Sequence, residues 1–155
     1  MEKKTKIHAE DNKQDLVITR EFDLPVELLF KAYTEPEIVA QWMGTKVIQL
    51  ENRKNGAWQF ETSDPNGNVV FKANGVIHDF VPNEKIVRTF EMENVNFAPQ
   101  LEFLEFEKLS DESSKLTMQI IYKSIEHRMT QLKMPFAMGL NMAHDRLEEI
   151  VTKLK

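Results

Sequence analysis

The C-terminal stretch from Pro135 to Lys155 carries the clearest periodic pattern in the chain. Its apolar residues recur at spacings of three and four, which on a helix of about 3.6 residues per turn form one stripe. Pro135 suits the first helical position, because its missing N–H has no intrahelical partner there. We therefore expect one amphipathic helix, roughly 30 Å long. The stripe consists of Phe136, Leu140, Ala143, Leu147, Ile150, Val151 and Leu154.

The N-terminal part of the chain predicts one strand followed by two short helices. Residues 15–22 alternate between apolar and polar positions, as a half-buried strand does. Pro25 is expected to open the first helix, and Gly44 to end the second one. Thr34 and Glu37 have the spacing of a capping box, in which each side chain satisfies the backbone N–H of the other residue. The second helix is therefore expected to begin at this box.

From residue 45 to residue 123, strand-like segments alternate with turn sequences such as Asn55-Gly56 and residues 64–68. Asn55-Gly56 predicts a type I′ hairpin turn, in which both central residues need positive φ. Connections this short join antiparallel neighbours, because parallel strands need a long crossover. The pattern therefore predicts a curved antiparallel sheet of about six to seven strands.

Two interruptions of the strand pattern predict β-bulges. Residues 69–81 are long for one strand, and Asn74-Gly75 marks the expected position of the first bulge. In residues 101–109 the apolar positions shift in phase, from 101 and 103 to 104 and 106. The second bulge is expected at this shift.

The element order predicts an α+β fold, in which the long C-terminal helix covers the apolar face of the sheet. Residues 1–13 form a polar N-terminal tail, within which residues 6–9 are a candidate edge strand. Residues 14–155 contain no repeat, low-complexity segment or linker, and are expected to form a single domain. A chain of this length can bury roughly 70% of its unfolded surface.

Composition and charge exclude several classes of protein. The net charge of −5 argues against binding to nucleic acid or to an anionic membrane, because both need a basic face. No stretch approaches the roughly 20 apolar residues of a membrane span. The sequence has no cysteine, which excludes disulfides, thiol catalysis and thiolate metal sites. Residues 1–13 lack the apolar segment of a secretory signal, so a cytoplasmic location is the simplest interpretation.

The sequence carries no recognisable catalytic or metal-binding motif. The four histidines do not have the spacing of a zinc site, and the five glycines do not form a phosphate-binding loop before a helix. We therefore expect no catalytic residue, no metal and no cofactor.

Several segments resemble the family named after the C-terminal domain of the Hsp90 ATPase activator. They are ITREFDLP (18–25), LFKAYTEP (29–36), VAQW (39–42), NGAWQF (55–60), GVIH (75–78), RTF (88–90) and DRLEE (145–149). This family is part of the START-like, Bet v 1-like (SRPBCC) superfamily. The resemblance implies a START-like domain with a helix-grip fold, in which the sheet wraps around the C-terminal helix and often leaves an apolar cavity between them. Members include lipid carriers, aromatic polyketide cyclases, stress-related binders of hydrophobic molecules and the co-chaperone domain.

Candidate ligand-binding residues are the aromatic and apolar side chains of the strands and the long helix, together with a few polar groups that could orient a ligand. A filled core and a ligand pocket use the same residue types, so both interpretations stay open. The polar candidates are His78, Arg88, Tyr122 and His144. The complete set is Trp42, Trp58, Phe60, Phe71, His78, Arg88, Phe90, Met92, Phe103, Met118, Ile120, Tyr122, Phe136, Leu140 and His144.

Three functions are consistent with these observations. The first is non-enzymatic binding of a hydrophobic small molecule, lipid-like or aromatic (polyphenolic), between the sheet and the C-terminal helix. The second is a protein–protein module with a chaperone as its partner, as the resemblance to the co-chaperone domain implies. The third is an enzyme of the cyclase or hydrolase type. Met138 and Met142 point away from the helix stripe, which leaves a monomer and a weak homodimer open.

Overall fold

The computed structural model of the protein describes residues 4–133 and 135–155. Residues 1–3 of the expected tail and Met134 lie outside this part of the chain. The described residues form eight strands and four helices. The strands are β1 (Lys6–His8), β2 (Asp15–Phe22), β3 (Lys46–Leu50), β4 (Ala57–Ser63), β5 (Val69–Val81), β6 (Lys85–Met92), β7 (Gln100–Ser110) and β8 (Ser113–Ile121). The helices are α1 (Val26–Thr34), α2 (Pro36–Met43), α3 (Ile125–Lys133) and α4 (Phe136–Thr152).

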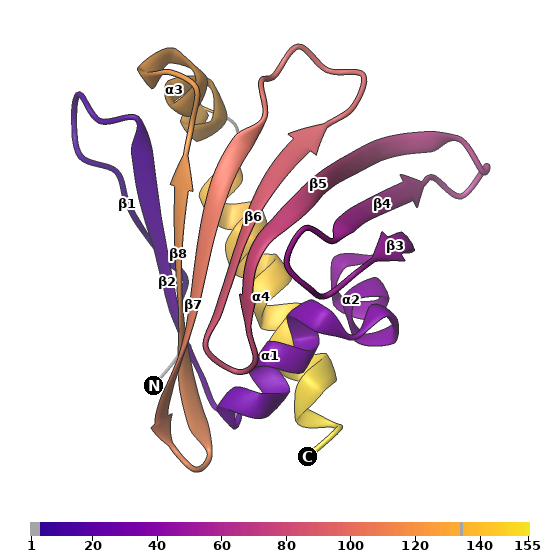
Figure 1. Ribbon diagram of the computed structural model, residues 1–155, viewed down its shortest axis with the longest axis vertical. Coiled ribbons are helices and arrows are strands. Elements are labelled where there is room, and N and C mark those ends of the chain that lie inside the picture. The colour runs from indigo at the N-terminus through magenta and orange to yellow at the C-terminus, as the bar shows by residue number, and fades with distance from the viewer. Residues whose placement is uncertain (1–3, 134) are drawn as a thin grey trace.

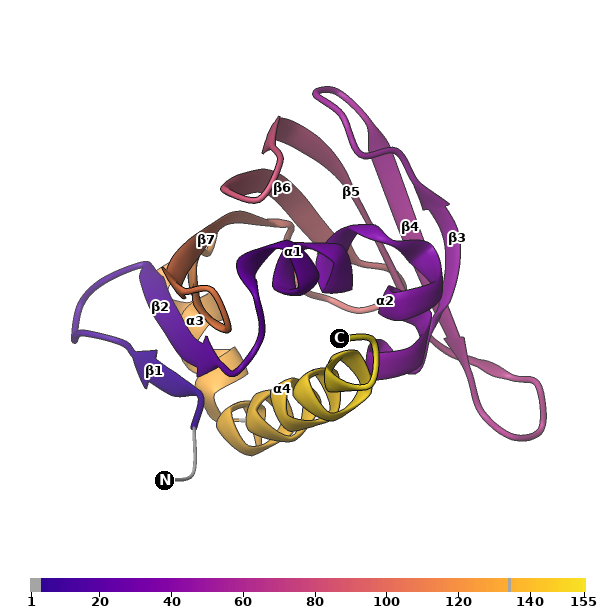
Figure 2. The same cartoon turned by 90° about the horizontal axis from the view of Figure 1, so that it is seen from below.

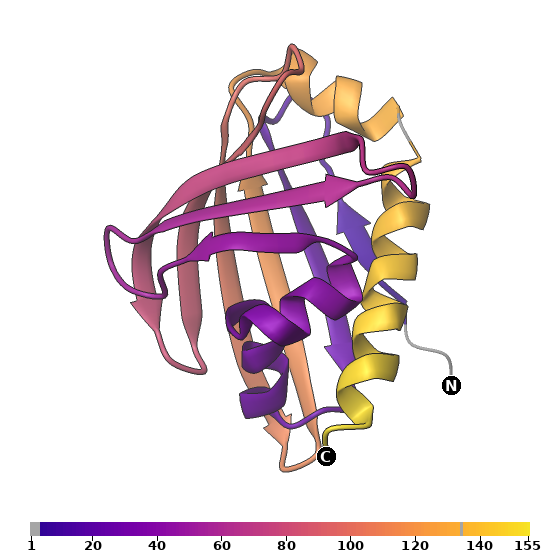
Figure 3. The ribbon, with the colours of Figure 1, turned by 90° about the vertical axis from the view of Figure 1, so that its right-hand side faces the viewer.

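The strands form one antiparallel sheet in the order β1-β2-β8-β7-β6-β5-β4-β3 (Figure 1). Seen from below, the sheet is an arch that runs from β1 to β3, with α1 and α2 beneath it (Figure 2). Helix α4 runs along the open side of the arch (Figure 3). The predicted helix-grip α+β fold is confirmed, and the sheet has eight strands rather than six or seven.

The apolar stripe of α4 is buried or partly buried as the sequence predicts, but the helix ends at Thr152, before Leu154. Leu147 and Val151 are fully buried, whereas Leu154 is half exposed. Met138 and Met142 are exposed, as expected for the opposite side of the helix. The apolar stripe therefore holds α4 over the concave face of the sheet.

The predicted capping box is wrong. Thr34 is the last residue of α1, and its hydroxyl donates a hydrogen bond to the carbonyl oxygen of Phe30 at 3.0 Å. Helix α2 follows after one residue, with Glu35 as an N-cap that makes no side-chain hydrogen bond and with Pro36 at its start. Because α1 extends through Thr34, the Thr34 hydroxyl forms a hydrogen bond within α1 and does not cap α2. Gly44 ends α2 at φ 62, as predicted.

The predicted type I′ turn is also wrong. Asn55 has a φ of 66, but Gly56 lies outside the positive-φ region. Gly56 is required for space: a Cβ there would lie 2.0 Å from the carbonyl oxygen of Glu51. The backbone of Asn55 and Gly56 is paired with Ile77 of β5, so the loop packs on the sheet and does not form a two-residue hairpin.

The irregularities of the strands lie elsewhere than predicted. The register of β5 against β6 shifts between Ile77 and Asp79, and not at Asn74-Gly75. The register of β7 against β8 is continuous from Leu101 to Lys108 and shifts only before Ser110. Because β7 has no bulge at the change of phase, its inward-facing residues continue backward from Phe106 and Leu104 to two polar residues, Glu102 and Gln100. All four are buried.

Candidate functional site

A cavity of about 350 Å³ lies between the concave face of the sheet and α4. Most of the side chains that line it are apolar. The lining residues come from six strands, β2, β4, β5, β6, β7 and β8, and from all four helices. The volume lies within the range of roughly 300 to 1,000 Å³ that is typical of small-molecule sites. The arrangement therefore has both the size and the lining of a site for an apolar ligand.

Eleven of the fifteen candidate residues line this cavity. They are brought together from helices α2 and α4 and from strands β4, β5, β6 and β8. The eleven are Trp42, Phe60, Phe71, Arg88, Phe90, Met92, Met118, Ile120, Phe136, Leu140 and His144.

Two aromatic candidates, Trp58 and Tyr122, are buried beside the cavity without lining it. The Trp58 indole packs against Phe60 and Phe90, and its Nε1 donates a hydrogen bond to the carbonyl oxygen of Thr89 at 3.1 Å. The hydroxyl of Tyr122 is hydrogen-bonded to the side chain of Gln131. Burial raises the pKa of the Tyr122 phenol, so it remains protonated at neutral pH. Both side chains support the cavity wall from behind.

His78 and Phe103 lie away from the cavity. The register shift between Ile77 and Asp79 falls at His78, which is exposed. Phe103 lies between Glu102 and Leu104, both of which face inward, and so it faces the opposite side of β7. His78 and Phe103, which the sequence analysis named as candidate ligand contacts, therefore do not line this cavity.

Sequence reasoning missed the polar residues at the centre of the site, Glu102 and Gln100. Arg88 and Glu102 are directly opposite each other on β6 and β7, and Arg88 Nε donates a hydrogen bond to Glu102 Oε1 at 2.9 Å. Gln100 Nε2 donates to Glu102 Oε2 at 2.7 Å. The Arg88 guanidinium also lies over the Trp58 ring, 5.3 Å from its centroid. Extending the alternation of β7 backward from Leu104 would have identified both residues.

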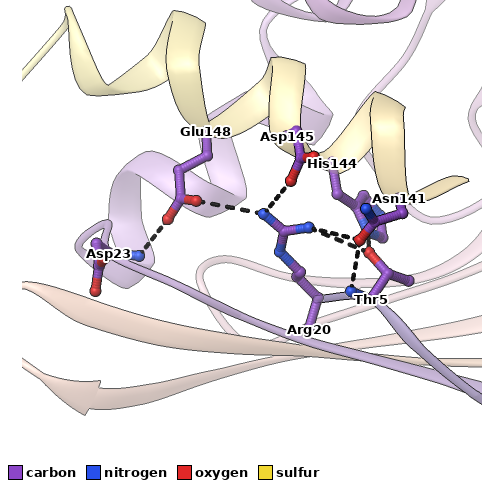
Figure 4. A network of polar contacts seen from close by, with 7 residues as sticks. All are labelled: Thr5, Arg20, Asp23, Asn141, His144, Asp145 and Glu148. Carbon is purple, nitrogen blue, oxygen red and sulfur yellow. Dashed lines mark hydrogen bonds and ion pairs between the residues drawn. The ribbon is translucent and has the colours of Figure 1, made fainter. Parts of the chain in front are cut away.

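Helix α4 is held to the sheet by polar contacts that converge on Arg20 of β2 (Figure 4). Arg20 Nη2 lies 2.8 Å from Asp145 Oδ1 and 3.3 Å from Glu148 Oε2, and Nη1 donates to Asn141 Oδ1 at 3.2 Å. The Arg20 side chain is almost completely buried. Glu148 Oε1 also accepts a hydrogen bond from the backbone N–H of Asp23 at 2.6 Å. These contacts fix the position of the helix that forms one wall of the cavity.

His144 connects this network to the cavity. Its Nδ1 lies 2.7 Å from the Thr5 hydroxyl oxygen, and its ring packs edge-on against Phe22. Burial, together with the positive charge of Arg20, lowers the pKa of His144 to about 4. The imidazole is therefore neutral at pH 7 and acts as a polar but uncharged part of the wall.

These features, a curved sheet that wraps around a C-terminal helix with an apolar cavity between them, define the protein as a helix-grip protein of the START-like, Bet v 1-like class. Residues 23–152 match the family model described as Activator of Hsp90 ATPase homolog 1-like protein. The chain belongs to this family.

Solved structures with this fold come from several bacteria. A protein from Mycobacterium smegmatis is 18% identical, with a TM-score of 0.82 over 95% of this chain and 96% of its own. One from Rhodobacter sphaeroides is 18% identical, with a TM-score of 0.86 over 97% and 99% of the two chains. One from Staphylococcus epidermidis is 18% identical, with a TM-score of 0.78 over 94% of each chain. At this level of identity the similarity shows the fold alone. No curated protein matches the chain.

Residues 4–133 and 135–155 contain neither a membrane-spanning helix nor a cluster of metal ligands. No helix there combines the length and the apolar character needed to cross a membrane. In the same ranges, no group of three or more His, Asp or Glu side chains could hold a metal ion.

Proposed function

We propose that the protein binds a hydrophobic small molecule, lipid-like or aromatic, in the cavity between the sheet and α4, without catalysing a reaction on it. The observation that carries the proposal is the apolar cavity of about 350 Å³. Moving an apolar ligand out of water into such a site contributes about 25 cal/mol per Å² of apolar surface buried. The few polar groups in the wall can then fix the orientation of the ligand.

The membership of the family also supports the alternative of a chaperone partner. Nothing in the described residues, however, marks a particular surface for such a partner, whereas the cavity is a formed site. Ligand binding is therefore the function that the geometry supports best.

The proposal is tested by thermal denaturation with neutral lipophiles such as 2-naphthamide and 1-decanol. A ligand that binds only the folded state raises the melting temperature as its concentration rises. Leu140→Trp, which would fill the cavity, should abolish this shift. Met142→Trp, on the exposed side of the same helix, should preserve it. An unchanged melting temperature with all lipophiles, or equal shifts in the two variants, would argue against the cavity as a binding site.

Native mass spectrometry of freshly purified protein provides a second, independent test. A retained ligand would appear as an added mass that is lost under denaturing conditions, and the same spectrum gives the number of subunits. Stable association with a chaperone, with no ligand-dependent shift in melting temperature, would favour the protein–protein alternative instead.

A further inference from the structure

One charged pair lies within the mostly apolar concave wall of the sheet. Across the sheet, Ile77 of β5, Arg88 of β6, Glu102 of β7 and Ile120 of β8 are each paired directly with the next. The ion pair thus lies in the middle of the sheet, with an isoleucine on each side. Folding alone does not require such a pair, because well-packed apolar residues of similar volume are often equally stable or more stable. A polar pair in this position can instead provide hydrogen bonds to a bound ligand.

Arg88 has hydrogen-bonding capacity that the protein leaves unused. A guanidinium carries five N–H donors, and the hydrogen bond to Glu102 uses the one on Nε. Within residues 4–133 and 135–155, the Nη1 and Nη2 atoms of Arg88 have no hydrogen-bond acceptor, although the side chain is only 13% exposed. Because Arg88 lines the cavity, an acceptor bound there can reach these donors.

A second unused donor lies in the same wall. The Tyr33 side chain is buried and lines the cavity, and its hydroxyl has no hydrogen-bond partner among the described residues. Burial raises the pKa of this phenol, so the hydroxyl keeps its proton at neutral pH and can donate it in a hydrogen bond. Arg88 and Tyr33 therefore both offer donors to the cavity.

The charges in the lining favour an acceptor that is negative. Besides the pair of Arg88 and Glu102, the lining includes Arg146, an exposed side chain whose Nε donates to the carbonyl oxygen of Trp42, and His144, which is neutral at pH 7. Both oxygens of Glu102 are already hydrogen-bonded, one to Arg88 and one to Gln100. A negatively charged acceptor would therefore meet the Arg88 donors that Glu102 leaves unused. The planar arrangement of guanidinium N–H groups matches a carboxylate in particular.

We propose that the ligand is an apolar molecule with one carboxylate, which is bound by Arg88 with help from Tyr33 while its apolar part contacts the aromatic and aliphatic wall. This inference rests on the proposed function, since it specifies the ligand class of the same cavity.

The test compares 2-naphthoate with the neutral 2-naphthamide by isothermal titration calorimetry at pH 7.5, where the acid is ionised. The two molecules share the same apolar part, so the difference in affinity reports the contribution of the charge. We expect the acid to bind at least about tenfold more tightly. Equal affinities would overturn the carboxylate inference while leaving the proposed function intact. If neither the two naphthyl compounds nor the neutral lipophiles bind, both fail.

Two variants test the role of Arg88 itself. The double variant Arg88→Met with Glu102→Met removes the pair without leaving an unpaired charge, so the ratio of the affinities for 2-naphthoate and 2-naphthamide should fall to about one. Glu102→Gln removes only the negative charge and should increase the preference. Circular dichroism melting curves confirm that each variant is folded at the titration temperature. A preference for the acid that persists in the double variant would overturn the assignment of the carboxylate to Arg88.

Discussion

His144 is a buried imidazole located between the cavity and the contacts that hold α4. Since its pKa in the folded protein is about 4, compared with an ordinary value of 6.5, the unfolded chain takes up a proton at a higher pH than the folded protein does. The stabilising contribution of the neutral ring is therefore complete above about pH 6.5 and is lost as the pH falls toward about 4.

We expect the pH dependence of unfolding to change in His144→Gln. In the wild-type protein, the His144 contribution to the free energy of unfolding should fall by an amount on the order of 3 kcal/mol between pH 7 and pH 4. The variant should lack this part of the decrease. Urea denaturation at a series of pH values measures it for both proteins. Parallel pH profiles would show that His144 does not titrate as its surroundings indicate.

Gly75 and Gly139 provide a matched pair of substitutions. A Cβ at position 75 would lie 1.9 Å from the carbonyl oxygen of Thr89 and 2.4 Å from Trp58 Nε1, whereas a Cβ at position 139 meets nothing within 4 Å. Gly75→Ala should destabilise the fold by about 2 kcal/mol or more, because backbone and indole must both shift. Gly139→Ala, within α4, should stabilise it by up to about 1 kcal/mol. Thermal unfolding of the two variants measures the change in stability of each. Similar changes in stability would contradict the close packing at Gly75.

Among the elements, α4 depends on both apolar and polar contacts. Its apolar stripe packs over the concave face, but the cavity separates part of the helix from the sheet. Arg20 supplies a fixed polar attachment to β2, through Asn141, Asp145 and Glu148. This attachment keeps the helix in place where the cavity leaves no direct packing.

Arg20→Met should therefore loosen α4 preferentially. We expect a loss of about 2–4 kcal/mol in the free energy of unfolding, because several hydrogen bonds to a buried cation disappear together. Arg53→Met, which removes an exposed pair with Glu51, should change it by less than about 0.5 kcal/mol. Hydrogen exchange measures the local effect and should be faster in α4 of the Arg20 variant. Uniform exchange throughout the chain would contradict a specific attachment.

The elements themselves were largely predictable from the sequence, because alternation and helical periodicity report directly which face is buried. The predictions that were wrong concern details that depend on residues distant in sequence. The capping box failed because the end of α1 at Thr34 is not visible in residue spacing. Glu102 was missed because a charged residue in a strand ordinarily faces water, and only its partner Arg88 on the next strand makes an inward position possible.

For the whole molecule, the family resemblance and the periodic pattern led to the helix-grip fold, which the structure and the family match both confirm. The cavity could not be predicted in the same way, because its volume depends on how far α4 lies from the sheet. Arg20, on β2 next to the edge strand β1, contributes to that distance. The candidate residues therefore came mostly from the correct faces of the strands, whereas whether the interior is hollow required the structure.

The central claim, that the space under α4 is a ligand site, is tested most directly by a two-dimensional ¹H–¹⁵N NMR titration of the labelled protein with 2-naphthoate. We predict saturable shifts of backbone amide signals concentrated in β6, β7 and the first half of α4, including Arg88, Glu102 and Leu140, whose side chains line the cavity. Signals of the outward-facing loop 64–68 should not move. Shifts confined to the outer faces of the sheet or helices, or no saturable shifts at all, would contradict the account.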